Sequence, residues 1–297
     1  MQNLYNLESK THMNYNRILV QILFLTIMAS LVYAQPIYTQ KDVDACSSKF
    51  KLAVDEKLSS EPIGEVITVI AKSFIGTNYD AHTLEKGDKE TLVVNLTGLD
   101  CYTFLESSLA LARCVKSGKT SFEEYLKEIE NIRYRDGKMK EYPSRLHYFS
   151  DWIYEMNKRE IGKDITQEIG GIPYDKKIDF MSTHVDAYKQ LKDNPKFVKE
   201  IEAVEKAINS RKYFYIPNDE IEKVEGKIHS GDILGITTNI NGLDISHTGI
   251  AYRADDGRIH LLHAPNVGYK VQISEKPLAE YLKGNKKQTG IMVLRPL

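Results

Sequence analysis

One cysteine of the chain, Cys101, stands where a nucleophile could be activated. A short apolar strand pattern at residues 91–96 breaks at Gly98, and an apolar helical pattern begins at Phe104, so Cys101 lies at the beginning of a predicted helix. The positive end of the helix dipole lowers the pKa of a thiol and favours the reactive thiolate. The pattern therefore predicts a nucleophile, although a lone cysteine is more often a small buried structural residue.

Two histidine-bearing strand patterns follow about 150 residues later, on either side of a turn signal at residues 255–257. We expect them to pair as antiparallel strands. Because side chains alternate between the faces of a strand, His247 and His263 can lie side by side on one face, while His260 points the other way. We predict that the pair lies beneath the helix that presents Cys101.

A cysteine and two histidines in this arrangement suit the hydrolysis of an amide. His247 would take the thiol proton and later protonate the leaving amine, while His263 would hold the imidazole of His247 in one tautomer. The backbone N–H of Cys101 would stabilise the oxyanion. The chemistry needs no cofactor. We predict no metal site, because the His260 and His263 side chains point to opposite faces and no other metal-binding motif accompanies them.

The elements that must position these residues predict an α+β fold with helices first and an antiparallel sheet second. Of the 297 residues, 42% are hydrophobic and 27% charged, which is enough for a substantial core. Helices are expected at residues 41–58, 65–74, 101–116, 121–131 and, with breaks, 185–209, and strands at 213–216, 232–237, 247–253, 258–263, 269–273 and 289–294. Residues 131–146 read as an exposed connection. No linker interrupts residues 35–297, which favours a single domain with a large insert at about residues 117–210.

The N-terminus has the layout of a secretory signal. Arg17 precedes an apolar run at residues 18–32, and Ala34 ends a small-residue site before Gln35. We therefore predict that residues 1–34 are a signal peptide cleaved near Ala34 and that the protein is exported, periplasmic or extracellular, with no stable membrane span after processing; an uncleaved anchor and a buried helix are the alternatives. A net charge of −1 argues against nucleic acid as the main partner.

The chain has three cysteines, an odd number for an exported protein. Cys46 and Cys114 either form a disulfide or are small buried residues, and the sequence leaves both alternatives open.

Five motifs in order give the chain a family resemblance: Gly76-Thr77-Asn78-Tyr79, Asp100-Cys101, Gly231-Asp232-Ile233, His247-Thr248-Gly249-Ile250 and His263-Ala264. Together they resemble the NlpC-type papain-like cell-wall hydrolases. The chain departs from the common form of that superfamily, since Tyr102-Thr103 replaces Ser-Gly and 146 positions separate the cysteine from the first histidine.

The insert supports a narrower resemblance. Its Arg145-Leu146-His147-Tyr148 and Asp151-Trp152-Ile153 segments, with Gly170-Gly171, are similar to the N-acetylmuramoyl-L-alanine amidase-like branch of the superfamily. The resemblance implies a papain-like fold, with the nucleophile at a helix N-terminus packed on an antiparallel sheet. It also implies cleavage of the amide between the muramic acid lactyl group and L-alanine.

Six further residues are candidates for substrate contacts. Five of them have a structural alternative: Tyr79 lines the groove or packs on the core, Asp100 contacts substrate or caps the helix, Arg145 holds a peptide carboxylate or lies on the surface, and Asp151 and Trp152 contact sugar or pack in the core. The sixth is Ser246, beside His247.

The function that we predict is therefore a cysteine amidase acting on peptidoglycan or its released muropeptides. A stem-peptide endopeptidase cutting a D-glutamyl–diamino acid bond, a non-catalytic wall-binding module and a transferase are the alternatives. The sequence does not determine the oligomeric state.

Overall fold

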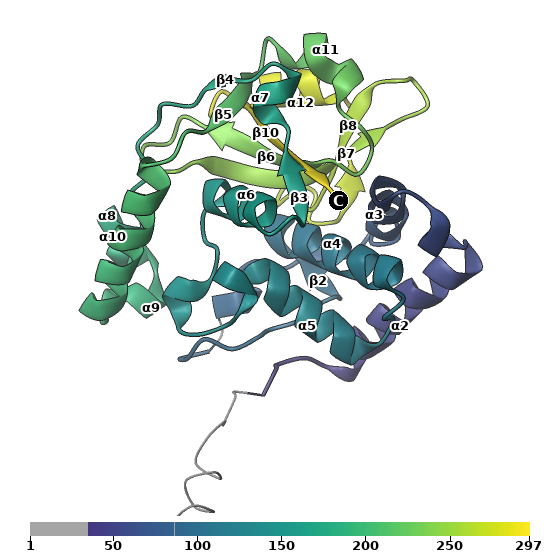
Figure 1. Cartoon of the computed structure of the whole chain (residues 1–297), viewed down its shortest axis with the longest axis horizontal. Coiled ribbons are helices and arrows are strands. Elements are labelled where there is room, and N and C mark those ends of the chain that lie inside the picture. Colours follow the sequence, from purple (N-terminus) through teal and green to yellow (C-terminus); the bar gives the residue numbers. More distant parts are fainter. Residues whose placement is uncertain (1–34, 86) are drawn as a thin grey trace, which may run out of the picture. The chain divides into compact units, whose positions relative to one another are not determined.

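The computed structural model describes residues 35–85 and 87–297, and element labels follow Figure 1. Residues 36–297 form one compact unit. The predicted signal peptide lies outside the described residues. Within the described part, no helix is long and apolar enough to cross a membrane.

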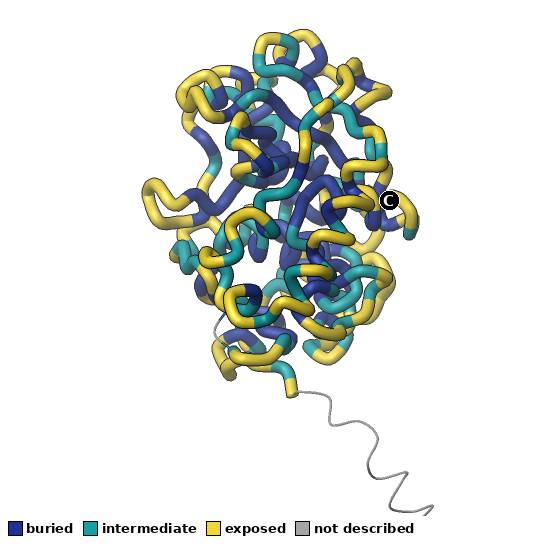
Figure 2. The backbone as a smooth tube through the Cα atoms, turned by 90° about the vertical axis from the view of Figure 1, so that its left-hand side faces the viewer, coloured by how far each residue is buried: buried dark blue, intermediate teal, exposed yellow. Residues whose placement is uncertain are grey.

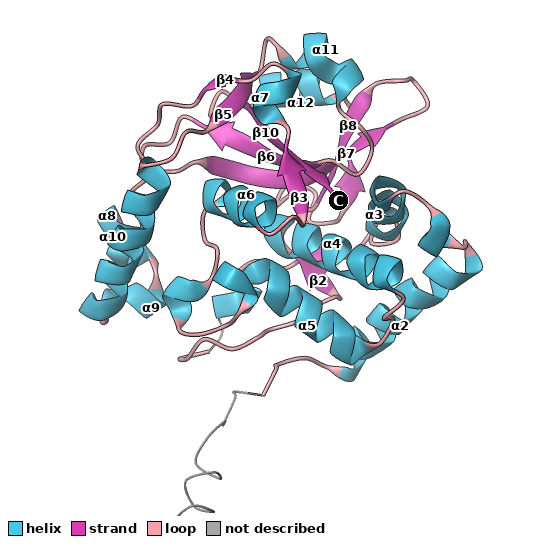
Figure 3. Cartoon of the chain, in the orientation of Figure 1, coloured by secondary structure: helices cyan, strands magenta, loops and turns pink. Residues whose placement is uncertain are grey.

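Helices dominate the first two thirds of the described chain (Figure 3). The described helices are α2 (Gln40–Asp55), α3 (Ile63–Lys72), α4 (Cys101–Ser117), α5 (Phe122–Arg133), α6 (Phe149–Lys158), α7 (Thr166–Ile169), α8 (Phe180–Thr183), α9 (Lys189–Lys192), α10 (Pro195–Asn209), α11 (Ile221–Val224) and α12 (Leu278–Lys283). The periodicity of apolar residues predicted α2 to α5 to within a few positions and α10 as the end of the broken helical stretch at 185–209, but it did not predict α6.

The last third is mainly strand, as predicted. The described strands are β1 (Asn78–Tyr79), β2 (Gly98–Leu99), β3 (Gly162–Asp164), β4 (Ile172–Pro173), β5 (Phe214–Pro217), β6 (Ile233–Thr238), β7 (Ile245–Arg253), β8 (Ile259–His263), β9 (Gln272–Ile273) and β10 (Gln288–Pro296). They form an eight-stranded sheet in the order β4-β5-β10-β6-β7-β8-β9, with β3 also paired to β10, while β1 and β2 pair separately. All the pairings within the large sheet are antiparallel.

Two predictions about the segments near α4 and α6 are wrong. Residues 91–96 form no strand beyond a single bridge between Ile37 and Val93, and the strand before Cys101 is the shorter β2. The stretch at 131–146 is not an exposed connection, because Tyr134, Tyr142 and Leu146 are buried. Its charged residues suggested exposure, but aromatic side chains between them carry it into the core.

The insert between α4 and the histidine strands is part of the sheet. Its strand β3 pairs with the end of β10, and its strand β4 pairs with β5. The insert therefore extends one edge of the sheet and adds α5 and α6 to the layer of helices around α4.

Two apolar layers cover the two faces of the sheet. One contains Ile233, Ile250 and Leu262 together with residues of α2 to α6. The other contains Ala251 and Leu261 together with residues of α7, α11 and α12. Figures 1 and 2 show the sheet lying between these groups of helices, with its strands largely buried. This arrangement explains why the strands are apolar on both faces.

One glycine allows helix α6 to approach the sheet closely. A Cβ added at Gly235 of β6 would lie 2.4 Å from ring atoms of Phe149, the first residue of α6. The aromatic ring therefore occupies the space that a side chain on β6 would need.

We predict that Gly235→Ala lowers the free energy of unfolding by about 1–3 kcal/mol, because an extra methyl group in a filled core forces strain. Thermal unfolding followed by circular dichroism measures the change. Gly226→Ala is the matched control, since a Cβ there meets nothing within 4 Å. Equal melting temperatures for the two variants would contradict the prediction.

Candidate active site

Asp100 caps the helix that carries Cys101. Its Oδ1 accepts hydrogen bonds from the backbone N–H of Tyr102 at 3.0 Å and of Thr103 at 2.7 Å, and the Thr103 hydroxyl accepts one in return from the Asp100 N–H at 3.0 Å. This reciprocal capping fixes Cys101 as the first residue of α4. Of the two roles expected for Asp100, the structure shows the cap.

Strand β7 holds the beginning of α4 through Thr248. The Thr248 hydroxyl donates a hydrogen bond to the carbonyl oxygen of Cys101 at 2.8 Å, and its side chain is buried. The backbone N–H and the hydroxyl of Thr248 also face the thiol of Cys101. The thiol therefore lies against the residue that follows His247.

The pKa of the thiol differs from the expectation based on the helix dipole. Burial, followed by the negative charge of Asp100, raises the pKa of Cys101 to about 12, and the hydrogen bonds from Thr248 offset only part of the rise. Loss of hydration outweighs the dipole at this position. Cys101 is therefore a neutral thiol at neutral pH in the free protein.

The two histidines contact each other as predicted. Nε2 of His247 lies 2.7 Å from Nδ1 of His263, and the two rings are nearly perpendicular, with their centroids 5.0 Å apart. His263 is fully buried and packs its ring against the edge of Tyr281 in α12, at 5.3 Å. Burial lowers the pKa of His247 to about 4, and burial together with the neighbouring imidazole lowers the pKa of His263 to about 3. Both imidazoles are therefore neutral at neutral pH.

The position of the pair relative to α4 differs from the prediction. In the pairing of β6 with β7, His247 lies opposite Ile236, which faces the α12 layer, while Thr248 lies opposite Gly235, which faces α6. Because side chains alternate between the two faces of β7, the imidazole of His247 points away from the face that α4 covers. Cys101 reaches the strand through Thr248, and within the described residues no hydrogen bond joins its sulfur to either imidazole.

Tyr79 lies beside the thiol. The pKa of its hydroxyl is raised to about 12, first by burial and then by the charges of Cys101 and Asp100. Its strand β1 pairs with β2, which leads directly into Cys101, and its backbone N–H donates to the Tyr269 carbonyl at 2.8 Å. Ser246, which immediately precedes His247, is exposed.

Three side chains that were expected to contact substrate are instead bound by other residues of the protein. Arg145 is buried in ion pairs with Glu85 and Glu90, so its guanidinium is not free to hold a peptide carboxylate. The Trp152 ring is fully buried and stacks on Phe149, leaving no face for a sugar.

Asp151 follows the same pattern as Trp152. Only 1% of Asp151 is exposed, and its carboxylate binds Arg135 at 2.5 Å and Arg211 at 2.7 Å. The expectation that Asp151 and Trp152 contact sugar is therefore wrong. Trp152 packs in the core against Phe149, and the Asp151 carboxylate is already bound by two arginines, so both side chains hold the insert to the core.

Sequence reasoning missed Thr248 as a residue of the site. The sequence contained a pattern that could have identified it. Side chains alternate along a strand, so Thr248 lies on the face opposite to His247, and that face is the one on which α4 packs.

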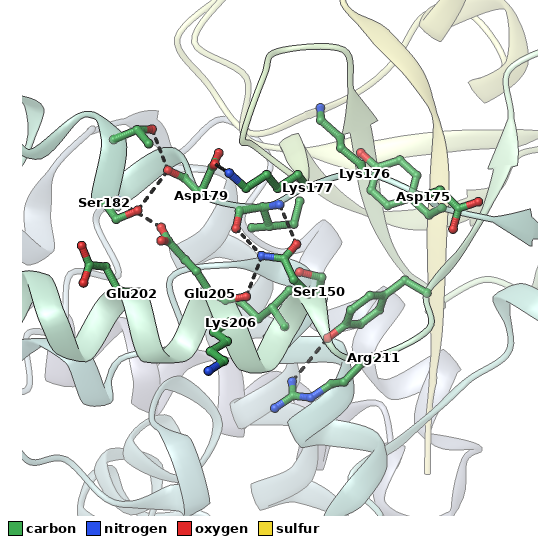
Figure 4. A pocket seen from close by; sticks show the side chains of 16 residues that line it. Ser150, Asp175, Lys176, Lys177, Asp179, Ser182, Glu202, Glu205, Lys206 and Arg211 are labelled. Carbon is green, nitrogen blue, oxygen red and sulfur yellow. Dashed lines mark hydrogen bonds and ion pairs between the residues drawn. The ribbon is translucent and has the colours of Figure 1, made fainter.

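A cavity of about 650 Å³ lies between α10, the segment that follows β4 and the residues that lead into β5 (Figure 4). Cys101, His247 and His263 do not line it. Its lining holds equal numbers of cationic and anionic side chains, four of each, and two of these, Lys177 and Asp179, form an ion pair at 2.6 Å. The cavity therefore presents no excess of either charge to a ligand.

The three cysteines are free thiols, and Cys46 and Cys114 are buried. The structure thus shows the second of the two alternatives for that pair. Among the described residues, no group of three or more His, Cys, Asp or Glu side chains is arranged to hold a metal ion.

Solved bacterial structures share this fold. An N-acetylmuramoyl-L-alanine amidase from Bacteroides uniformis is 36% identical, with a TM-score of 0.75 over 79% of this chain and 99% of that one. A Bacteroides fragilis protein that bears the provisional name xylanase is 39% identical, with a TM-score of 0.72 over 76% of this chain and 98% of that one. A Legionella pneumophila protein at 23% identity has the same fold, with a TM-score of 0.62 over 86% of this chain and 95% of that one.

No curated protein matches the chain. The fold and its relatives define the class of the protein as a hydrolase of the cell-wall amidase type. A family model described as AmiA-like, N-acetylmuramoyl-L-alanine amidase-like, matches residues 69–291. The chain belongs to this N-acetylmuramoyl-L-alanine amidase-like family.

We predict that Cys101 keeps its reactivity with iodoacetamide from pH 6.5 down to about pH 4. Only a neutral imidazole can accept the thiol proton, and the lowered pKa of His247, about 4, keeps it neutral over that range. The measurement is the alkylation rate of the Cys101 peptide by mass spectrometry at each pH. His247→Ala is the control, and its rate should rise with hydroxide concentration. A midpoint near pH 6.5 in the unsubstituted protein would contradict the prediction.

Proposed function

We propose that this protein is an exported cysteine amidase that hydrolyses the amide between the muramic acid lactyl group and L-alanine in peptidoglycan or its fragments. One observation carries the proposal: a thiol at a capped helix start lies against the strand residue next to His247, and a second imidazole hydrogen-bonds that histidine. The papain-like assignment of the nucleophile is part of the proposal. The amidase family supports the class of bond.

In the proposed mechanism His247 is the base. Its Nε2 is occupied by His263, so Nδ1 is the nitrogen that remains to accept the thiol proton. In this assignment His247 donates its Nε2 hydrogen to Nδ1 of His263, and His263 carries its own hydrogen on the buried Nε2. His263 is a positioning residue that selects the tautomer of His247.

The thiol and the imidazole start neutral, so proton transfer accompanies attack on the substrate carbonyl. The Cys101 sulfur bonds to the lactyl carbonyl carbon, and the backbone N–H of Cys101 donates to the oxyanion. His247 then protonates the L-alanine nitrogen as the amide bond breaks and a thioester remains. Water, deprotonated by His247, hydrolyses the thioester and restores the thiol.

The surroundings of the thiol suggest two further roles. In this proposal Tyr79 lines the groove beside the attacked carbonyl. The pKa of its hydroxyl is raised by burial first and then by the charge of Cys101, which indicates that the two groups are close. Ser246 is exposed next to the base and forms the rim of the same groove. A substrate contact by Asp100 would use the carboxylate oxygen that does not cap α4.

The signal peptide is the part of the proposal that sets the location. We expect the mature protein to begin at Gln35, so that export brings it to the cell wall. Edman sequencing of the protein purified from the periplasm or the medium measures this. A mature N-terminus upstream of residue 18 would contradict cleavage.

We predict that Cys101→Ala lowers the rate of muropeptide hydrolysis at least about 10³-fold, because it removes the nucleophile. Mass spectrometry of the products identifies the bond: free sugar with an intact stem peptide indicates the amidase, and a cut stem indicates the endopeptidase. Cys114→Ala, which removes a buried thiol outside the site, is the control. Full activity of Cys101→Ala would exclude the mechanism, and binding without turnover by the unsubstituted protein would indicate a wall-binding module.

We predict that His263→Asn lowers kcat at least about 10-fold, because it weakens control of the His247 tautomer. Its matched control is His260→Asn on the same strand. His260 points to the opposite face and bonds the Ser274 carbonyl at 2.8 Å. Steady-state kinetics separate the two, and equal kcat values would contradict the role of His263.

A further inference from the structure

The buried carboxylate of Asp244 lies just before the histidine strand β7. Asp244 is 1% exposed, and among the described residues it forms no ion pair. Its two oxygens instead accept backbone hydrogen bonds: Oδ2 from the N–H of Ser150 at 2.7 Å and Oδ1 from the N–H of Ile245 at 2.8 Å. A buried carboxylate is costly unless it is hydrogen-bonded, so its position is closely defined by its donors on Ser150 and Ile245.

These contacts join two parts of the chain that meet only in the tertiary structure. Ser150 is in the first turn of α6, in the insert, whereas Asp244 leads into β7. The carboxylate therefore caps α6 from outside the helix and is favoured by the positive end of its dipole. Tyr174, also from the insert, donates its hydroxyl hydrogen to the Asp244 carbonyl at 2.7 Å.

Strand β7 is irregular between this anchor and His247. His247 pairs with Ile236, but the next pairing joins Thr237 to Ile245, so Ser246 is an extra residue that bulges out. A bulge re-aims the side chains beside it, and a slip of one residue would turn every side chain to the other face. The direction of the His247 imidazole thus depends on what fixes the chain before the bulge.

Asp244 also lies close to the beginning of α4. The pKa of Tyr102, which follows Cys101, is raised well above its ordinary value by burial first and then by the charges of Glu106 and Asp244. The same carboxylate is thus near the nucleophile's helix and fastened to the base's strand.

We propose that Asp244 is a positioning residue: its carboxylate fastens the beginning of β7 to the first turn of α6 and so fixes the bulge beside His247, on which the direction of the His247 imidazole depends. The proposal rests on the function proposed above for Cys101 and His247. In this proposal the insert helps to position His247, since two of the hydrogen-bond donors to Asp244, on Ser150 and Tyr174, belong to the insert.

The first test is steady-state kinetics on a muropeptide with the full mature protein. Asp244→Ala should lower kcat about 10- to 100-fold and leave KM within about threefold, because displacement of a base slows proton transfer more than binding. Asp244→Asn keeps the size of the side chain and one acceptor oxygen, so it should fold and lose less activity than the alanine variant.

Glu225→Ala is the matched control. Glu225 is also buried and also accepts a backbone hydrogen bond, from Ile259 at the far end of the adjacent strand β8. It should lower the melting temperature as Asp244→Ala does and leave kcat unchanged. An equal loss of kcat in both variants would show that Asp244 is merely structural.

The second test is independent of the substrate: the alkylation rate of Cys101 between pH 4 and pH 9. Asp244→Ala should lose the rate that depends on His247 and approach the profile of His247→Ala. Asp244→Asn should lose a smaller part of that rate, and Glu225→Ala should keep the unsubstituted profile. Unsubstituted profiles in both Asp244 variants would overturn the proposal. If the protein cleaves no muropeptide, the proposed function fails, and the alkylation profiles still decide the role of Asp244.

Discussion

The contact between Thr248 and the first residue of α4 is the constraint on which the rest of the site depends. The Thr248 hydroxyl, which is buried, donates a hydrogen bond to the Cys101 carbonyl oxygen at 2.8 Å. This hydrogen bond holds the start of a helix against one face of β7. Because neighbouring residues of a strand point to opposite faces, it also determines that His247 leaves the strand on the other face. The thiol and the base thus come from two layers that meet at a single strand.

Burial, rather than charge, sets the resting state of these groups. The pKa of Cys101 is raised and those of His247 and His263 are lowered, so all three are neutral in the free protein. Such a site differs from one that stores a thiolate–imidazolium ion pair. Because the raised pKa leaves the Cys101 thiol little ionised at neutral pH, transfer of its proton to a base must accompany its attack on a substrate.

Much of the fold and part of the site followed from the sequence. The periodicity of apolar residues predicted the long helices except α6, together with the C-terminal strands, and alternation along β7 and β8 correctly brought His247 to His263. The same methods did not predict the environments of Arg145 and Trp152. Whether an arginine meets a substrate or a glutamate, and whether an indole faces solvent or a phenylalanine, depends on residues distant in the chain, here Glu90 and Phe149. The insert was recognised as unusual, but its strands β3 and β4 are too short to show a pattern.

Sequence alone determined the chemistry that the chain carries: a cysteine at a helix start after a capping aspartate, and two histidines of the same parity on paired strands. These are local properties, which follow from the type and spacing of residues that are close together in the chain. Tertiary structure alone decided how that chemistry is held. It placed Thr248 between thiol and base, removed enough hydration from the three reactive groups that their pKa values favour the neutral forms, and joined Asp244 to the insert across about ninety positions of the chain. Hydration and long-range hydrogen bonding depend on which distant segments pack together, and no local pattern records that.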